Sequence, residues 1–187
     1  MGRLGPRPWY VQYAFILAVS RLHNQCVAPL AFPAMAAKLL ICYEGSDRAG
    51  HAIAVCGELF PGAQAHVLNV WEPMERIVAR YAAIGPYIGD SIGEADSDIS
   101  GEADAVAAAG VALAQQAGLE ATPHAIAVRT SVSEAVIALA DELDVNVIVT
   151  GTRSLHGVRE ALSTTLSHAL LQRSRRAVLA VPMPADD

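Results

Sequence analysis

Five apolar runs of strand length recur after residue 37, and helical patterns separate them. Unbroken apolar runs are typical of parallel strands that are buried on both faces. Crossovers that contain a helix force parallel pairing with right-handed connections. The sequence therefore predicts an α/β fold, a three-layer sandwich around a five-stranded parallel sheet. The predicted strands cover 38–43, 65–71, 121–128, 145–150 and 177–182.

Residues that cap helices mark the ends of the segments between these strands. Ser46 follows the first strand and can accept a hydrogen bond from a free backbone N–H at a helix start. Gly118 stands where a helix commonly ends, and Ser131 and Ser133 are alternative caps for the next helix. The predicted helices cover 49–60, 101–118, 131–144 and 164–174.

The stretch from 74 to 97 separates the second strand from the alanine-rich helix. It contains Gly85-Pro86, two further glycines and several acidic residues. Glycine and proline interrupt regular structure, so this stretch predicts a long connection with room for a partial helix.

Residues 1–36 differ in composition from the chain that follows. They contain Arg3, Arg7 and the apolar run YVQYAFILAV, which is too short to span a bilayer as a helix. A secretory signal would have this basic start, but the small residues AFPAMAA lie far beyond the apolar run. We therefore predict an N-terminal extension over 1–36, either disordered or absent because translation begins at Met35, and one domain over 37–187.

The charge and the cysteine and histidine spacing exclude several classes of partner. A formal net charge of −6 argues against nucleic acid, and the short basic run at 173–176 is interpreted as a solvated turn. Cys26, Cys42 and Cys56 form no C-x-x-C pair, which favours reduced thiols in a cytosolic protein. No histidine spacing suits zinc, so we predict no metal site. Because the apolar run near the N-terminus is too short, we also predict no membrane span.

Chemistry-bearing residues follow two of the predicted strands, where ligands bind on parallel sheets. Glu44 offers a carboxylate to a ribose hydroxyl or a base amine, and Gly151 allows close approach of a backbone to a ligand. Hydroxyls of Thr164, Thr165 and Ser167 stand near a helix start, where free N–H groups and the helix dipole favour an anion. The alternative is that these hydroxyls only cap the helix.

These segments together resemble the universal stress protein family over about 37–184. KLLICYEGSDRAGHAI is similar to the family's first strand and acidic loop, VLNVWEP to its second strand, and ALADELDVNVIVTGTRS to its third helix and fourth strand. The resemblance implies a Rossmann-like sheet of order 3-2-1-4-5, related to that of the adenine nucleotide alpha hydrolases. It also implies a cytoplasmic stress-response protein that binds ATP or a related adenine nucleotide.

The family's phosphate motif, Gly-x2-Gly-x9-Gly-[Ser/Thr], is altered in this chain. Gly151 keeps the first glycine, whereas Ser154 and Thr164 replace the other two. A Cβ at either position would cost about 1 kcal/mol or more if the backbone were left-handed. The resemblance places Tyr43, Glu44 and Val70 around the base and ribose. It places the remaining candidates around the phosphates: Thr150, Gly151, Arg153, Ser154, Thr164, Thr165 and Ser167.

The matched region suggests a nucleotide sensor and not an enzyme. It pairs no general base with a nucleophile and has no Walker-type G-K-[S/T] lysine. The alternative is a dimeric interaction module of the same fold that binds no nucleotide. In either case the resemblance implies a homodimer through the last strand, AVLAVPMP. A related hydrolase would need a glycine- and serine-rich loop after the first strand, which YEGSDRAG lacks.

Overall fold

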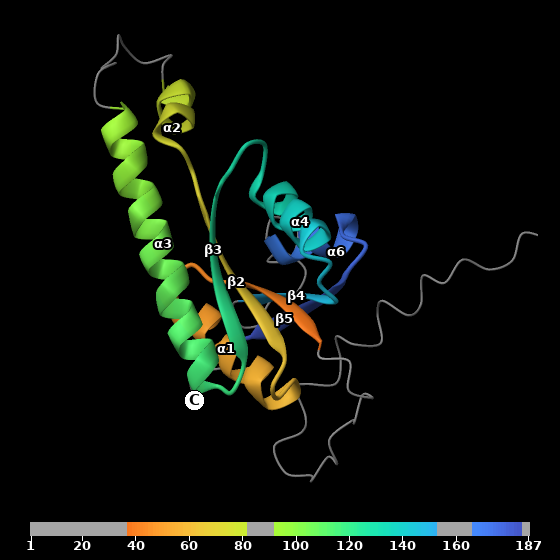
Figure 1. The fold of residues 1–187 in the computed structure, drawn as a ribbon. Helices are drawn as coiled ribbons and strands as arrows, with labels where there is room; N and C mark the ends of the chain where they lie inside the picture. Colours follow the sequence, from red (N-terminus) through yellow and green to blue (C-terminus); the bar gives the residue numbers. More distant parts are fainter. Residues whose placement is uncertain (1–36, 82–91, 153–165, 185–187) are drawn as a thin grey trace, which may run out of the picture. The chain divides into compact units, whose positions relative to one another are not determined.

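The computed structural model describes residues 37–81, 92–152 and 166–184, which form a five-stranded parallel sheet flanked by helices (Figure 1). The sheet order is β3-β2-β1-β4-β5. The predicted fold class and the order implied by the resemblance are therefore confirmed. In chain order the elements are β1 (Lys38–Cys42), α1 (Asp47–Leu59), β2 (Gln64–Trp71), α2 (Met74–Tyr81), α3 (Ile92–Gln116), β3 (Glu120–Ala127), α4 (Val132–Glu142), β4 (Val147–Thr152), α6 (Leu166–Arg173) and β5 (Ala177–Pro182).

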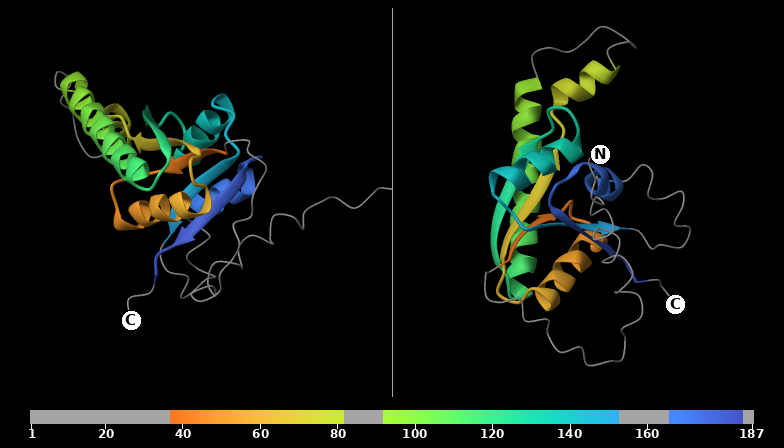
Figure 2. Two further views of the ribbon diagram at one scale, coloured as in Figure 1. Left: turned by 60° about the horizontal axis from the view of Figure 1, so that its bottom comes forward. Right: turned by 90° about the vertical axis from the view of Figure 1, so that its right-hand side faces the viewer.

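Helices α1 and α3 cover one face of the sheet, and α4 and α6 cover the other (Figure 2). A hydrophobic core lies under each pair of helices. In β1, Leu39 and Ile41 belong to the first core, while Leu40 and Cys42 belong to the second, and none is more than 8% exposed. Alternate side chains of a strand point to opposite faces, so a run buried on both faces must be apolar throughout. This burial, at about 1.5–3 kcal/mol for each large aliphatic side chain, explains the unbroken apolar runs in the sequence.

Two predicted helix caps are in place. The Ser46 hydroxyl accepts a hydrogen bond from the Ala49 N–H at 3.4 Å, and the Ser131 hydroxyl accepts one from the Glu134 N–H at 3.2 Å. Ser131 is therefore the cap of α4. Ser133, the other candidate, is buried in the first turn, with its hydroxyl oxygen 3.2 Å from that of Ser131.

The alanine-rich helix starts earlier than predicted, because α3 begins at Ile92 and not at 101. The stretch read as a long connection therefore contains α2 as well as the start of α3. A helical glycine costs only about 1 kcal/mol relative to alanine, and the prediction gave Gly93 too much weight. Packing of α3 against α2 and a 2.6 Å bond from the Met74 N–H to Asp96 Oδ1 support this part of α3 (Figure 1).

The basic run at 173–176 leads from the end of α6 through a turn to β5, as predicted, and two of its arginines pair with α4 and the turn after it. Arg173 Nη2 lies 2.7 Å from Glu134 Oε1. Arg176 contacts Asp141 at 3.0 Å and Asp144 at 2.7 Å, and it donates to the Val145 carbonyl at 2.9 Å. Arg175 is exposed. Two of the three arginines therefore join β5 and α6 to α4.

The predicted extension, 1–36, lies outside the described residues. Among the helices of the described ranges, none is both long and apolar enough to cross a membrane.

Candidate functional site

The carboxyl ends of β1 and β4 lie side by side at the centre of the sheet. The register pairs Ile41 with Val149 and Cys42 with Thr150, so the loop that begins at Tyr43 lies beside Gly151. The chain leaves β1 toward β2 on one side, while β4 lies on the other side. This is the switch in strand order where open α/β sheets bind ligands.

Glu44 is held by the first turn of the helix that follows it. Its Oε1 accepts hydrogen bonds from the Ser46 hydroxyl and from Arg48 Nη2, the latter at 3.1 Å. The Glu44 side chain is nevertheless 54% exposed. Its carboxylate is therefore positioned and accessible, with acceptor capacity left for a ligand hydroxyl or amine.

The Tyr43 side chain is part of the hydrophobic core and only 8% exposed. Its ring packs on α3, where a Cβ added to Gly110 would lie 2.6 Å from Tyr43 Cδ1. The Tyr43 main chain faces β2 instead, because its N–H donates to the Leu68 carbonyl at 2.8 Å and its carbonyl accepts from Asn69 Nδ2 at 2.9 Å. Asn69 lies at a strand end where ligands are expected but is not among the predicted binding residues, although its lone amide in the apolar run HVLNVW is a signal.

Val70 lies on the other face of the sheet from the Tyr43 ring. It is half-buried against the core under α4 and α6, beside Ile126 of β3. The structure therefore does not bring the side chains of Tyr43 and Val70 together.

Gly151 is required by the close approach of α1 to β4. A Cβ added there would lie 2.5 Å from the Arg48 carbonyl oxygen and 2.7 Å from its carbon. Such contacts are too short for any side chain, and the obstacle is backbone in the first turn of α1. Gly151 therefore has a packing role that does not depend on a ligand.

Thr150 and Ser167 are joined to each other. Their hydroxyl oxygens lie 2.8 Å apart, and both residues are 3% exposed. The bond connects the end of β4 to the start of α6. The remaining phosphate candidates, Arg153, Ser154, Thr164 and Thr165, lie outside the described residues.

Arg76 of α2 connects two loops at the carboxyl ends of β2 and β3. Its guanidinium donates to the carbonyls of Arg129 and Thr130, and its Nε lies 3.6 Å from Glu72 Oε1. Arg76 is not among the residues predicted from the sequence, because an arginine in a predicted connection belongs to no recognisable motif. The contact ties α2 to the loop before α4.

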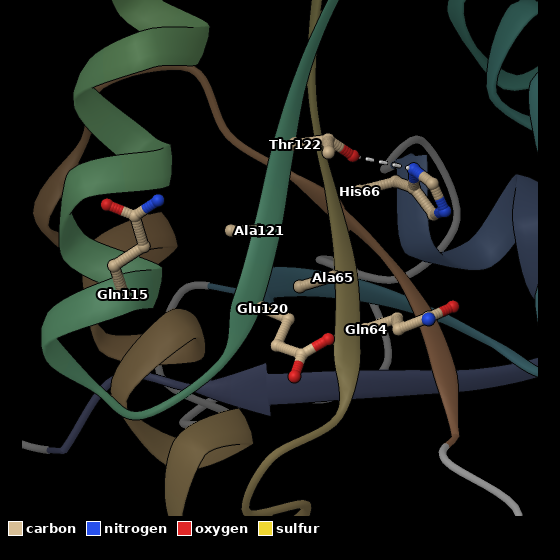
Figure 3. A pocket seen from close by; sticks show the side chains of 7 residues that line it. All are labelled: Gln64, Ala65, His66, Gln115, Glu120, Ala121 and Thr122. Atoms are coloured by element: carbon tan, nitrogen blue, oxygen red, sulfur yellow. Dashed lines mark hydrogen bonds between the residues drawn. The ribbon is translucent and has the colours of Figure 1, made fainter.

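A pocket lies elsewhere, at the amino-terminal halves of β2 and β3. Figure 3 shows its lining: His66 and Thr122 are joined by a hydrogen bond on one side of the strands, and Gln115 of α3 lies on the other. This pocket is remote in the fold from the carboxyl ends of β1 and β4. Among the described residues, no group of three or more His, Cys, Asp or Glu side chains is arranged to hold a metal ion.

Solved structures of universal stress proteins share this fold. The protein from Burkholderia pseudomallei aligns with a TM-score of 0.58 and 19% identity over 80% of this chain and 98% of its own. The Archaeoglobus fulgidus protein in complex with dAMP gives 0.51 and 17%, over 78% and 97%. The Arabidopsis thaliana protein with AMP bound gives 0.51 and 11%, over 81% and 94%. At these identities the likeness establishes the fold alone.

The sequence itself carries the family assignment. No curated protein matches the chain at a significant level. Residues 35–182, which include all ten described elements, match the universal stress protein family. The chain therefore belongs to the universal stress protein family.

Proposed function

We propose that this universal stress protein binds ATP or a related adenine nucleotide between the carboxyl ends of β1 and β4 and acts as a sensor. The observation that carries the proposal is the exposed Glu44 carboxylate, in the loop that follows β1 next to the end of β4, where the strand order switches. A carboxylate there suits the hydroxyls of a ribose. The dAMP and AMP complexes of the two relatives described above support an adenine nucleotide as the ligand.

A sensor fits the described side chains better than a catalyst does. The hydroxyls of Thr150 and Ser167 hydrogen-bond to each other and are buried. Activating a hydroxyl as a nucleophile requires a general base within hydrogen-bond reach, and within the described ranges neither hydroxyl is paired with one. In a sensor, binding of the nucleotide would change the conformation of the protein or the set of partners that it binds.

We also propose a homodimer through β5. In the described sheet β5 is an edge strand that pairs only with β4. Its sequence, AVLAVP, is apolar, and an apolar edge favours pairing with a second chain. A two-fold axis would place two copies of β5 against each other.

A cytoplasmic location is part of the same proposal. Cys42 and Cys56 are free and buried, and burial raises the pKa of both thiols to about 12. Unpaired cysteines are typical of proteins in reducing compartments.

Calorimetry with ATP and AMP on the full chain tests nucleotide binding. We expect Glu44→Gln to weaken binding by about tenfold to a hundredfold, because a hydrogen bond to a charged group contributes about 1.5–3 kcal/mol. Glu58→Gln, an exposed glutamate at the far end of α1, is the matched control and should bind as the parent does. Absence of binding at millimolar nucleotide would contradict the proposal. The alternative function, a dimeric interaction module that binds no nucleotide, would then remain.

Light scattering tests the homodimer separately. We expect the mass of two chains with and without nucleotide. A monomer at micromolar concentration would exclude dimerisation through β5 while leaving the nucleotide result unaffected.

A further inference from the structure

A pair of histidines on β2 and β3 lies outside the proposed nucleotide site. His66 Nδ1 and His124 Nε2 are 2.9 Å apart, and the ring centroids are 5.1 Å apart. The register pairs His66 with Thr122 and His124 with Leu68, so the two rings are diagonal neighbours on one face of the sheet. Because 58 residues separate them, spacing along the sequence gave no sign of the pair.

The surroundings of the pair are polar and open to solvent. Both histidines are half-buried, while Gln64, Glu120 and Thr122 are exposed and line the same pocket as His66 (Figure 3). Alternation along the strands places these side chains on the same face of the sheet as the two rings. An ion can therefore reach the ring nitrogens from solvent and keep water in its remaining coordination positions.

Burial and neighbouring charges both act on the pKa values of the two rings. Burial lowers the pKa of both histidines, and for His66 the neighbouring His124 and Lys38 lower it further. Glu142 acts in the opposite direction on His124. Coordination of a metal uses the neutral form of imidazole, in which one ring nitrogen has a free lone pair.

We propose that His66 and His124 form a two-histidine binding site for a divalent transition-metal ion of the nickel, copper and zinc group. Metal–nitrogen bonds of about 2.0–2.1 Å place adjacent ligand nitrogens about 2.9–3.4 Å apart, and these two are already at that separation. On binding, the ring that donates in the present contact carries its proton on its other nitrogen, so that both lone pairs face the ion.

Imidazole ligands select the class of ion. Magnesium and calcium require several oxygen ligands, whereas nickel, copper and zinc bind imidazole well, with copper the strongest. Glu120 and Glu142 add negative charge near the pair, and Lys38 opposes it. Thr122 Oγ1, 3.0 Å from His66 Nδ1, exchanges its bond to the ring for one to a metal-bound water.

Zinc chloride alone, titrated calorimetrically into the full chain at neutral pH, tests the site. We expect one zinc ion to be bound in the parent protein and its affinity to fall at least about tenfold in both His66→Gln and His124→Gln. His51→Gln and His168→Gln, on α1 and α6, are the controls and should bind as the parent does. Equal affinity in all five proteins would overturn the proposal.

Imidazole NMR signals of the parent protein decide the question if the variants fail to fold. Zinc should shift the ring signals of His66 and His124 together and at the same metal concentration, leaving those of His51 and His168 unchanged. Ring signals of His66 and His124 that do not respond to zinc at neutral pH would overturn the proposal, whether or not zinc binds elsewhere.

Discussion

The hydroxyl oxygens of Thr150 and Ser167 lie 2.8 Å apart inside the protein and join the end of β4 to the start of α6. Both residues are 3% exposed, so neither hydroxyl has water as an alternative partner. Loss of one hydroxyl therefore leaves the other buried without its hydrogen bond, which makes the pair a test of what holds α6 against the sheet.

Thr150→Val and Ser167→Ala should each lower the free energy of unfolding by about 1–3 kcal/mol, the cost of an unsatisfied buried polar group. The double variant should lose less than the sum, because it removes both partners. Urea unfolding of the four proteins measures the coupling. Thr152→Val is the control in the same strand, since its hydroxyl makes only a 3.4 Å contact with the Val181 carbonyl. Additive losses would show that the two hydroxyls are not coupled.

Gly151→Ala should destabilise the protein by about 1–3 kcal/mol, because the new Cβ meets the Arg48 backbone and α1 must shift. Gly101→Ala is the matched control: nothing lies within 4 Å of its Cβ position. In α3 that change should raise stability by up to about 1 kcal/mol. Thermal unfolding compares the two. Equal effects would mean that α1 does not pack on Gly151 as described.

The contact of Arg176 with Asp144 should make stability depend on pH in the acid range. Hydrogen bonding to Arg176 holds the pKa of the Asp144 carboxyl below its ordinary value. A carboxyl whose pKa is lowered in the folded protein stabilises the folded state at pH values above its pKa in the unfolded chain, about 3.9. This stabilisation is lost as the pH falls through the pKa of the folded protein. Arg176→Ala should therefore reduce the difference in unfolding midpoint between neutral and acid pH.

Arg175→Ala controls for the loss of a positive charge from the same turn, because Arg175 is exposed. Its pH profile of thermal unfolding should follow that of the parent. A profile for Arg176→Ala that also follows the parent would show that this ion pair does not contribute.

His66 and His124 should titrate below the ordinary histidine pKa of about 6.5, whatever their response to zinc. Because the folded pKa is lowered, the unfolded chain binds more protons in this range. The contribution of these two neutral rings to the free energy of unfolding is therefore fully present above about pH 6.5. It is lost as the pH falls through their pKa values in the folded protein. NMR titration of the ring protons measures the pKa values of both histidines. Values at or above that of a model peptide would contradict burial as the dominant influence.

The architecture could be predicted because it depends on patterns that are local in the sequence. The unbroken apolar runs specify strands buried on two faces, and Ser46 and Ser131 carry the side-chain oxygen that a helix start needs. The start of α3 could not be predicted in this way. It depends on the contact with α2 and on Asp96, which is 22 residues from its partner, Met74.

The candidate site was predictable in position but not in detail. The end of β1 and the end of β4 were both expected to matter, and their adjacency follows from the sheet order. Which side of the sheet a side chain enters is a tertiary property, so nothing local showed that the Tyr43 ring would pack on α3. The contact between His66 and His124 could not be predicted for the same reason, because it depends on the register of β2 and β3.

Because Gly151 packs against the Arg48 backbone, the presence of this glycine is not by itself a sign of nucleotide binding. A protein with this packing and no affinity for nucleotides would still need a glycine here in order to fold. Its presence is therefore a signature of the architecture, and the ability to bind a ligand has to be assessed from other positions.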